Sequence, residues 1–204
     1  MDLFSSNNKK IKLKIPDADV TLYQQFFSEK ESNKLLENLT NNIHWQQDHI
    51  KIYGKTIKLP RLTAWYGYPN LTYTYSGIAM NPKPWNNELL FLKDKIEKEL
   101  KVEFTSCLLN RYKTGNDYVG WHQDNEKELG KNPIIASVSF GQTRIFQLKH
   151  IYNKELKRIN IPLNHGSLLV MKGTTQHYWK HQIQKTTLQI QQRINLTFRI
   201  IKDI

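Results

Sequence analysis

The sequence predicts an α+β fold that is mainly β, in which a β-sandwich or jelly roll is buttressed by helices. Two helical segments lie in the first hundred residues, and from about residue 104 short β-rich runs alternate with turn residues. Apolar residues make up 39% of the 204 residues, which supports a core, and the length fits one domain with decorations. Residues 1–10 are polar, and we expect them to be disordered.

Both predicted helices show an apolar face and local signals for helix formation. The first begins at Ser28, and Glu31 follows three residues later, as in a capping box. Its apolar face consists of Leu35, Leu36 and Leu39. The second helix starts after Pro84, and its apolar positions are Leu89, Leu92, Ile96 and Leu100. Ion pairs four residues apart are expected on this helix, namely Asp94–Lys98 and Glu97–Lys101.

Five β-rich runs are predicted as strands: Thr105–Arg111, Ile134–Phe140, Arg144–Lys149, Ser167–Met171 and Ile194–Ile200. Gly141-Gln142 lies between the second and third runs and is typical of a hairpin turn. Cys107 is the only cysteine, so no intramolecular disulfide can form and a reducing compartment is expected. Within its β-rich run, this cysteine is expected to be a buried small apolar residue.

The charge balance predicts a polyanionic partner. Thirty lysines and arginines against eighteen acidic residues give a net charge of +12, which attracts nucleic acid, although a solubilising surface would have the same composition. No apolar run of 18 residues and no apolar N-terminal signal segment is present. We expect an intracellular monomer that binds nucleic acid and no membrane, cytoplasmic if bacterial and nuclear if eukaryotic.

A candidate metal motif lies in Val119-Gly120-Trp121-His122-Gln123-Asp124. In an extended segment the side chains of His122 and Asp124 point the same way and can reach one ion. Two imidazoles and one carboxylate on one face of a metal form the facial triad of non-haem Fe(II) oxygenases, which leaves positions open for co-substrate and O₂. On spacing alone, either His177 or His181 can be the third ligand.

A candidate anion site lies near the C-terminal end, where Arg193-Ile194-Asn195-Leu196-Thr197-Phe198-Arg199 alternates strictly. One face is apolar and belongs in a core, and the other is a row of donors that includes two guanidinium groups. Guanidinium groups bind carboxylates through two hydrogen bonds. Asn110-Arg111-Tyr112 offers a second polar strand end just before the metal motif, so the two strands together can hold a dicarboxylate.

These motifs, with Ala136-Ser137-Val138-Ser139-Phe140-Gly141 and His165-Gly166-Ser167, occur in the order and spacing of AlkB-type dioxygenases. The chain resembles this family from about residue 48 to 201, and most of all its subgroup that repairs alkylated double-stranded DNA. The resemblance implies a single dioxygenase domain over residues 1–204. In this domain a double-stranded β-helix core spans about 104–201, and a nucleotide-recognition lid with a hairpin spans about 45–80.

The resemblance also implies the cofactors and their ligands. Fe(II) would be held by His122, Asp124 and His181, and 2-oxoglutarate and O₂ would be co-substrates. By the same analogy, Arg199 would pair with the distal carboxylate of 2-oxoglutarate. Its remaining hydrogen bonds would come from Asn110, Tyr112, Arg193 and Asn195.

The lid region supplies candidate substrate contacts. Two runs in which apolar residues alternate with lysine or tyrosine flank Gly54-Lys55. They predict a basic hairpin with Tyr53 near its tip. An exposed aromatic there suits insertion into a duplex, and the resemblance implies that it fills the gap left by a flipped base. The alternative is that Tyr53 packs onto its own domain. The resemblance further implies that Tyr75 stacks on the flipped base, which Tyr73, Ser76 and Glu126 surround, although aromatics are also common in ordinary sheet packing.

The resulting hypothesis is a DNA oxidative demethylase that acts on N1-methyladenine and N3-methylcytosine. It would couple decarboxylation of 2-oxoglutarate to hydroxylation of the alkyl carbon. The sequence alone leaves three alternatives: the same chemistry on RNA, a protein hydroxylase on the same fold, and a catalytically silent nucleic-acid-binding module. The silent module predicts broken metal or co-substrate positions, whereas His122, Asp124, His181, Arg193 and Arg199 are all present.

Overall fold

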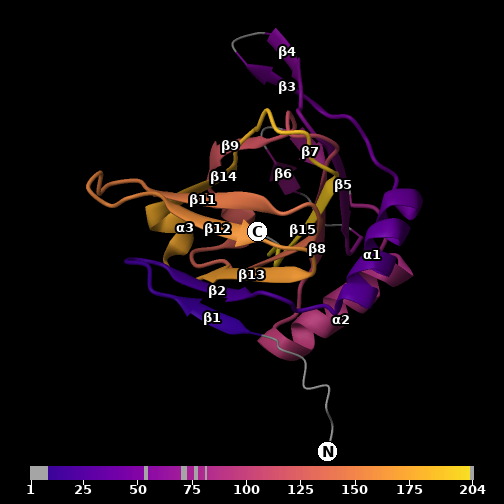
Figure 1. Cartoon of the computed structure of the whole chain (residues 1–204), viewed down its shortest axis with the longest axis horizontal. Coiled ribbons are helices and arrows are strands. Elements are labelled where there is room, and N and C mark those ends of the chain that lie inside the picture. Colours follow the sequence, from indigo (N-terminus) through magenta and orange to yellow (C-terminus); the bar gives the residue numbers. More distant parts are fainter. Residues whose placement is uncertain (1–8, 53–54, 70–72, 76–77, 81, 203–204) are drawn as a thin grey trace, which may run out of the picture.

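Two antiparallel sheets face each other, and two helices cover the outer side of the larger sheet (Figure 1). The computed structural model describes residues 9–52, 55–69, 73–75, 78–80 and 82–202. The larger sheet has the strand order β1 (Lys10–Leu13), β2 (Asp19–Tyr23), β13 (Ser167–Lys172), β10 (Ile135–Gly141), β15 (Arg193–Arg199), β8 (Ser106–Tyr112) and β5 (Leu62–Gly67). Because Lys10 pairs with Tyr23 in β1–β2, the expectation that residue 10 is disordered is wrong, and residues 1–8 lie outside the described residues.

The smaller sheet has the strand order β12 (Ile159–Leu163), β11 (Arg144–His150), β14 (Trp179–Ile183) and β9 (Val119–His122). Two hairpins complete the strands: β3 (His49–Ile52) with β4 (Lys55–Lys58), and β6 (Tyr73–Tyr75) with β7 (Ile78–Met80). In Figure 1 the β3–β4 hairpin projects from the body of the molecule, away from the helices. The helical elements are α1 (Glu29–Asn42), α2 (Asn87–Leu100), α3 (Thr175–Tyr178) and a 3₁₀ turn at Lys127–Leu129.

The alternation of side chains along the larger sheet divides the core into two clusters. On β13, Leu168 and Val170 pack toward the helices, whereas Leu169 and Met171 pack between the two sheets. β15 shows the same division, because Ile194, Leu196 and Phe198 all lie in the helix-side cluster. The predicted apolar face of this strand is thereby confirmed. Its polar face is left to point between the sheets.

Both predicted helices are confirmed. Glu31 accepts a hydrogen bond from the Ser28 amide at 2.8 Å, and Ser28 accepts one from the Glu31 amide, so the capping box is formed. On α2 the predicted Glu97–Lys101 pair is wrong, because Glu97 binds Lys93 at 2.9 Å instead, and the structure describes no ion pair between Asp94 and Lys98. The Glu97 carboxylate also accepts from the Phe104 amide at 2.5 Å, which draws it toward the loop after the helix. None of the described helices is long and apolar enough to cross a membrane.

The five predicted strands appear as β8, β10, β11, β13 and β15, each within one residue of its expected bounds. The predicted hairpin at Gly141-Gln142 is wrong, because β10 and β11 belong to different sheets. Both edges of β10 are already paired, with β13 and β15, so the chain must cross to the other sheet. Gly141 makes this turn at φ 86°, where an added Cβ would lie 2.4 Å from the Gln192 carbonyl oxygen.

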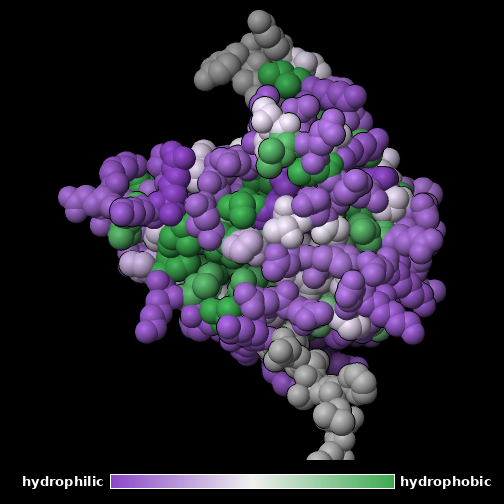
Figure 2. All heavy atoms as spheres, viewed as in Figure 1, coloured by the Kyte–Doolittle hydropathy of each residue, from purple (hydrophilic) through white to green (hydrophobic). Residues whose placement is uncertain are grey.

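Polar side chains cover most of the face in Figure 2, and apolar ones gather left of centre, over β12 and the strands below it. At this edge the cluster between the sheets reaches the surface, through partly buried Leu13 and Ile159. The space between the sheets also contains a cavity whose lining includes polar and charged groups.

Candidate active site

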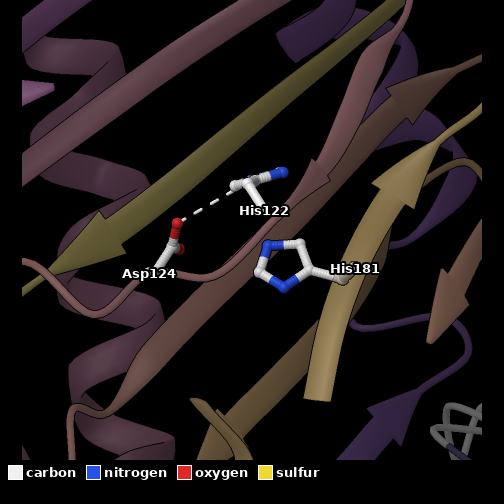
Figure 3. A group of neighbouring side chains, drawn as sticks. All are labelled: His122, Asp124 and His181. Atoms are coloured by element: carbon white, nitrogen blue, oxygen red, sulfur yellow. Dashed lines mark ion pairs between the residues drawn. The ribbon is translucent and has the colours of Figure 1, made fainter. Parts of the chain in front are cut away.

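Three side chains that can bind a metal meet between the sheets. His122 ends β9, Asp124 follows two residues later, and His181 lies on the neighbouring strand β14, directly opposite His122. One ligand atom from each residue lies within 4.8 Å of the other two, and Figure 3 shows the three side chains converging. His177 does not belong to this group, and its Nε2 atom lies 2.9 Å from Asn132 Oδ1. His181 is therefore the third member, as the resemblance implied.

An irregularity in the β9–β14 pairing brings His122 into this position. His122 pairs with His181 and Val119 with Ile183, so two residues of β9 oppose the single residue Gln182. Such a bulge keeps both Val119 and His122 on the cavity side, which a regular alternation would not allow at a spacing of three. Sequence periodicity does not show this bulge, because its extra residue is defined only by the partner strand.

Asp124 is held by a buried arginine. Arg199 Nη2 donates to Asp124 Oδ2 at 2.8 Å, and the two side chains are 4% and 1% exposed. Burial by itself would raise the pKa of Asp124, but Arg199 and the two histidines lower it to about 2. The carboxylate is therefore ionised at neutral pH. Its other oxygen, Oδ1, is buried and has no hydrogen-bond partner among the described residues.

Both histidines are neutral at physiological pH, which is the form that binds metals. Burial lowers the pKa of His122 and lowers that of His181 to about 3. The Nδ1 atom of His122 lies 2.8 Å from the Gly120 carbonyl oxygen, to which it donates when it carries the proton. This leaves Nε2 facing Asp124 Oδ1, at 3.8 Å. The ring of Phe146 stacks on His181, with ring centres 5.1 Å apart, and fixes its plane.

These residues fit a divalent metal ion. The group combines an ionised carboxylate, whose Oδ1 lacks a partner in the described part of the chain, with two neutral imidazoles. An unpartnered buried oxygen costs about 1–3 kcal/mol or more, and a metal ion would satisfy it. The His122 side chain remains 26% exposed, so the centre is open on one side. Ligands on one face and an open opposite side suit a metal that must also bind other molecules.

A polar cavity continues from the metal group between the sheets. All five predicted 2-oxoglutarate residues line it, together with the metal group and Thr197. The full lining is Asn110, Tyr112, Val119, His122, Asp124, Ser137, Phe146, Met171, His181, Ile183, Arg193, Asn195, Thr197 and Arg199. The polar row of β15 therefore faces this cavity, as its alternation predicted.

Arg193 is a buried cation with spare hydrogen-bond donors. It is 1% exposed, and its Nη2 atom donates to Ser139 Oγ at 2.9 Å. Its Nε and Nη1 atoms have no partner among the described residues, and its guanidinium lies 5.2 Å from the centre of the Tyr112 ring. Burial lowers the pKa of Arg193 to about 10, so the group is still charged at neutral pH. A carboxylate would satisfy both of its free donors.

Arg199 lies beside the metal group and binds Asp124. The resemblance assigns it to the distal carboxylate of 2-oxoglutarate, and in the structure its Nε and Nη2 atoms donate to Asp124 Oδ2 at 3.3 and 2.8 Å. Arg193 lies six residues earlier on the same face, roughly 20 Å away along the strand. The two Arg193 donors that lack a partner among the described residues are therefore at the end of β15 far from the metal group.

Arg61 is a further residue of this site and was not among the predicted ones. It is 5% exposed, and its Nε atom donates to Asn110 Oδ1 at 2.6 Å. This contact turns the amide NH₂ of Asn110 away from Arg61. No local pattern marks Arg61, because it meets Asn110 only through the pairing of β5 with β8.

The predicted substrate residues are described only in part. β3 pairs with β4 in the register Ile50↔Ile57 and Ile52↔Lys55, which confirms the hairpin, while its tip at Tyr53 lies outside the described residues. Tyr73 and Tyr75 bound β6, whose side chains are not described, and Ser76 lies outside the described residues. Glu126 is half-buried and immediately precedes the 3₁₀ turn, two residues after Asp124.

The fold and the metal group agree with a known class of enzymes. The chain belongs to the 2OG-Fe(II) oxygenase superfamily, which it matches over residues 19–199. The triad is the Fe(II) site of this superfamily, and 2-oxoglutarate is its co-substrate.

Alpha-ketoglutarate-dependent dioxygenase alkB homolog 3 of Homo sapiens is 43% identical over 190 residues, which cover 89% of this chain and 66% of that protein. DNA oxidative demethylase ALKBH2 of Homo sapiens is 35% identical over 188 residues, with coverage of 88% and 72%. These relatives place the chain in the AlkB branch of the superfamily.

Solved structures confirm the predicted jelly roll. The structure of OsALKBH1 superposes with a TM-score of 0.66 at 15% identity, covering 94% of this chain and all of that chain. A 2OG-Fe(II) oxygenase family oxidoreductase from Burkholderia pseudomallei gives a TM-score of 0.59 at 10% identity, with coverage of 88% and 84%. At these identities the likeness is one of fold.

Proposed function

We propose that this chain is an oxidative demethylase that repairs N-alkylated bases in DNA, with N1-methyladenine and N3-methylcytosine as substrates. The observation that carries the proposal is the complete triad beside a cavity that contains a buried cation with free donors. The relative that is 35% identical is named a DNA oxidative demethylase, which supports the substrate class. A silent binding module would not need an intact triad.

The chain's own residues would hold and orient the co-substrate. Arg193 would bind the distal carboxylate, with Tyr112 beside it, while Asn195 and Asn110 would line the path toward the metal. Arg199 would keep Asp124 ionised and correctly oriented. When bound, Fe(II) and 2-oxoglutarate supply the chemistry that couples decarboxylation to hydroxylation of an N-alkyl carbon by O₂, after which the alkyl group leaves as an aldehyde.

The substrate must present its alkyl group at the open side of His122. A methyl group on the pairing edge of a base is inaccessible in a duplex, so the base must leave the stack. We propose that Tyr53 on the β3–β4 hairpin fills the resulting gap, and that Tyr75 stacks on the extruded base. Tyr73, Ser76 and Glu126 would complete the pocket, with Glu126 balancing the positive charge of the methylated base.

A row of cations on the outer face of the smaller sheet fits a nucleic-acid backbone. Lys149 on β11 lies directly opposite Lys180 on β14, an arrangement of like charges that destabilises a sheet. Arg158, just before β12, lies 5.7 Å from the centre of the Trp121 ring on β9. The structure describes no ion pair to an acidic residue for any of these three cations. Phosphates would relieve the repulsion between these cations. Trp121, which Arg158 contacts, directly precedes the metal ligand His122 in sequence.

The direct test is demethylation of an oligonucleotide that carries one N3-methylcytosine, offered single-stranded, in a DNA duplex and as RNA. We expect loss of the methyl group that needs Fe(II) and 2-oxoglutarate and stops on addition of a chelator. Asp124→Ala should abolish it, because one of three metal ligands is removed. Turnover of RNA in strong preference to DNA would contradict the proposed substrate, and chelator-insensitive turnover would contradict the mechanism.

A further inference from the structure

We infer that Gln176 is a positioning residue for the metal centre, which holds the main chain of Asp124 against the segment that carries His181. The two parts of the triad come from separate stretches of chain. The β9–β14 pairing joins them at His122 and His181, but β9 ends there, and Asp124 lies two residues beyond the last pair. The sheet therefore does not position the carboxylate ligand.

Gln176 takes the place of the missing strand pairing. It lies on α3, the short helix between β13 and β14, and is 1% exposed. Its Oε1 atom accepts a hydrogen bond from the Asp124 amide at 3.0 Å. A second hydrogen bond joins the same two segments. Gln123, the residue before Asp124, donates from Nε2 to the Gln176 carbonyl oxygen at 2.5 Å. Two hydrogen bonds thus join the carboxylate loop to the start of β14.

The chemistry of the site requires a neutral amide here. The Asp124 amide is a donor, so the oxygen of the Gln176 side chain must face it. The nitrogen then points to Met171, whose Sδ atom lies 3.6 Å away and is a weak acceptor. A carboxylate at this position would place a second buried negative charge beside Asp124. An apolar side chain would leave a buried amide without a partner. Arg199 orients the carboxylate of Asp124, and Gln176 orients its backbone.

The test compares Gln176→Met with the unchanged chain, because methionine keeps the length and removes the amide. The probe is Co(II) alone, whose visible absorption reports both affinity and ligand geometry, at a temperature well below the unfolding midpoint of either protein. We expect the Kd for Co(II) to rise about 10- to 100-fold, as is typical when a group that supports a metal ligand is lost, and the absorption spectrum to change shape.

Gln182→Met is the matched control. Gln182 adjoins His181 in sequence but faces away from the metal and bonds Gln147 at 2.7 Å, so its Kd for Co(II) should stay near that of the unchanged chain. If Gln176→Met does not fold, Gln123→Ala removes the other half of the contact and should still raise the Kd. A normal Kd and spectrum in the folded Gln176→Met variant would overturn the inference, as would an equal loss in Gln182→Met. The inference rests on the metal centre of the proposed enzyme and not on its substrate, so a failed demethylation assay would leave this test unaffected.

Discussion

The charge states of single residues decide what the site can bind. Asp124 stays ionised because Arg199 donates to it, and His181 stays neutral because burial disfavours its charged form. Both ligands are therefore ready for a metal ion at neutral pH, with no proton to release. At the other end of the cavity, burial leaves Arg193 charged with two free donors, which favours an anion there.

The low pKa of His181 predicts how the metal-free protein responds to acid. The unfolded chain binds a proton at His181 near pH 6.5, whereas the folded protein does not until about pH 3. Stability is therefore lost as the pH falls from about 6.5 toward 3, by up to about 1.4 kcal/mol per pH unit from this one group. His181→Gln should reduce the pH dependence of the free energy of unfolding by the equivalent of one proton in this range. The measurement is urea unfolding at a series of pH values without metal. An unchanged slope would show that the folded protein protonates His181 normally.

Single elements carry the contacts that the proposed function needs. The bulge in β9 turns His122 toward the cavity, and α3 brings Gln176 to the Asp124 amide. The β3–β4 hairpin lies apart from both sheets in Figure 1, joined to the body through β5 and the loop before β3. Under the proposed function, this element would contact the second strand of a duplex while the base lies at the metal.

The hairpin yields a prediction about substrate form. Tyr53→Ala should reduce repair of a methylated duplex more than repair of the same single strand, because only the duplex has a gap to fill. The measurement is the ratio of kcat/KM on the two substrates. Tyr152→Ala, which changes a tyrosine that is 70% exposed elsewhere, serves as the control and should leave the ratio unchanged. Equal losses on both substrates in the Tyr53 variant would remove the wedge role.

At the scale of the whole molecule, net charge and its placement act together. The helices occupy the outer side of the larger sheet (Figure 1), and the proposed nucleic-acid surface is the outer face of the smaller sheet. The cations Lys149, Lys180 and Arg158 lie there, and Trp121 connects their row to the strand of the metal ligand His122. A backbone bound across this face would add affinity without reading sequence.

The basic row predicts a specific salt dependence. Replacing Lys149 and Lys180 with Gln should weaken binding to a DNA duplex and reduce the slope of log affinity against log salt by about 2, one for each lost phosphate contact. Replacing Lys34 and Lys98 on the helices removes the same charge from another face and is the control. If both pairs change the slope equally, the effect is one of net charge, and the row is not a binding surface.

Local patterns in the sequence determined much of this protein. The capping box at Ser28, five strands to within a residue and the two-faced alternation of β15 all follow from neighbours a few residues apart. Such patterns encode which side of an element is buried, because helix and strand periods repeat over short distances. They also marked His122 and Asp124 as candidate ligands. The resemblance of longer motifs added the family and the choice of His181.

Tertiary structure decided which elements meet. The crossing of the chain at Gly141, the bulge in β9 and the contacts of Arg61 and Gln176 each depend on a partner far away in sequence. The two arginines of β15 show the difference most clearly. They share one face and one residue type, yet Arg199 meets Asp124 and Arg193 keeps free donors. Periodicity assigns both to the same face, and only the packing of the second sheet against that face distinguishes their roles.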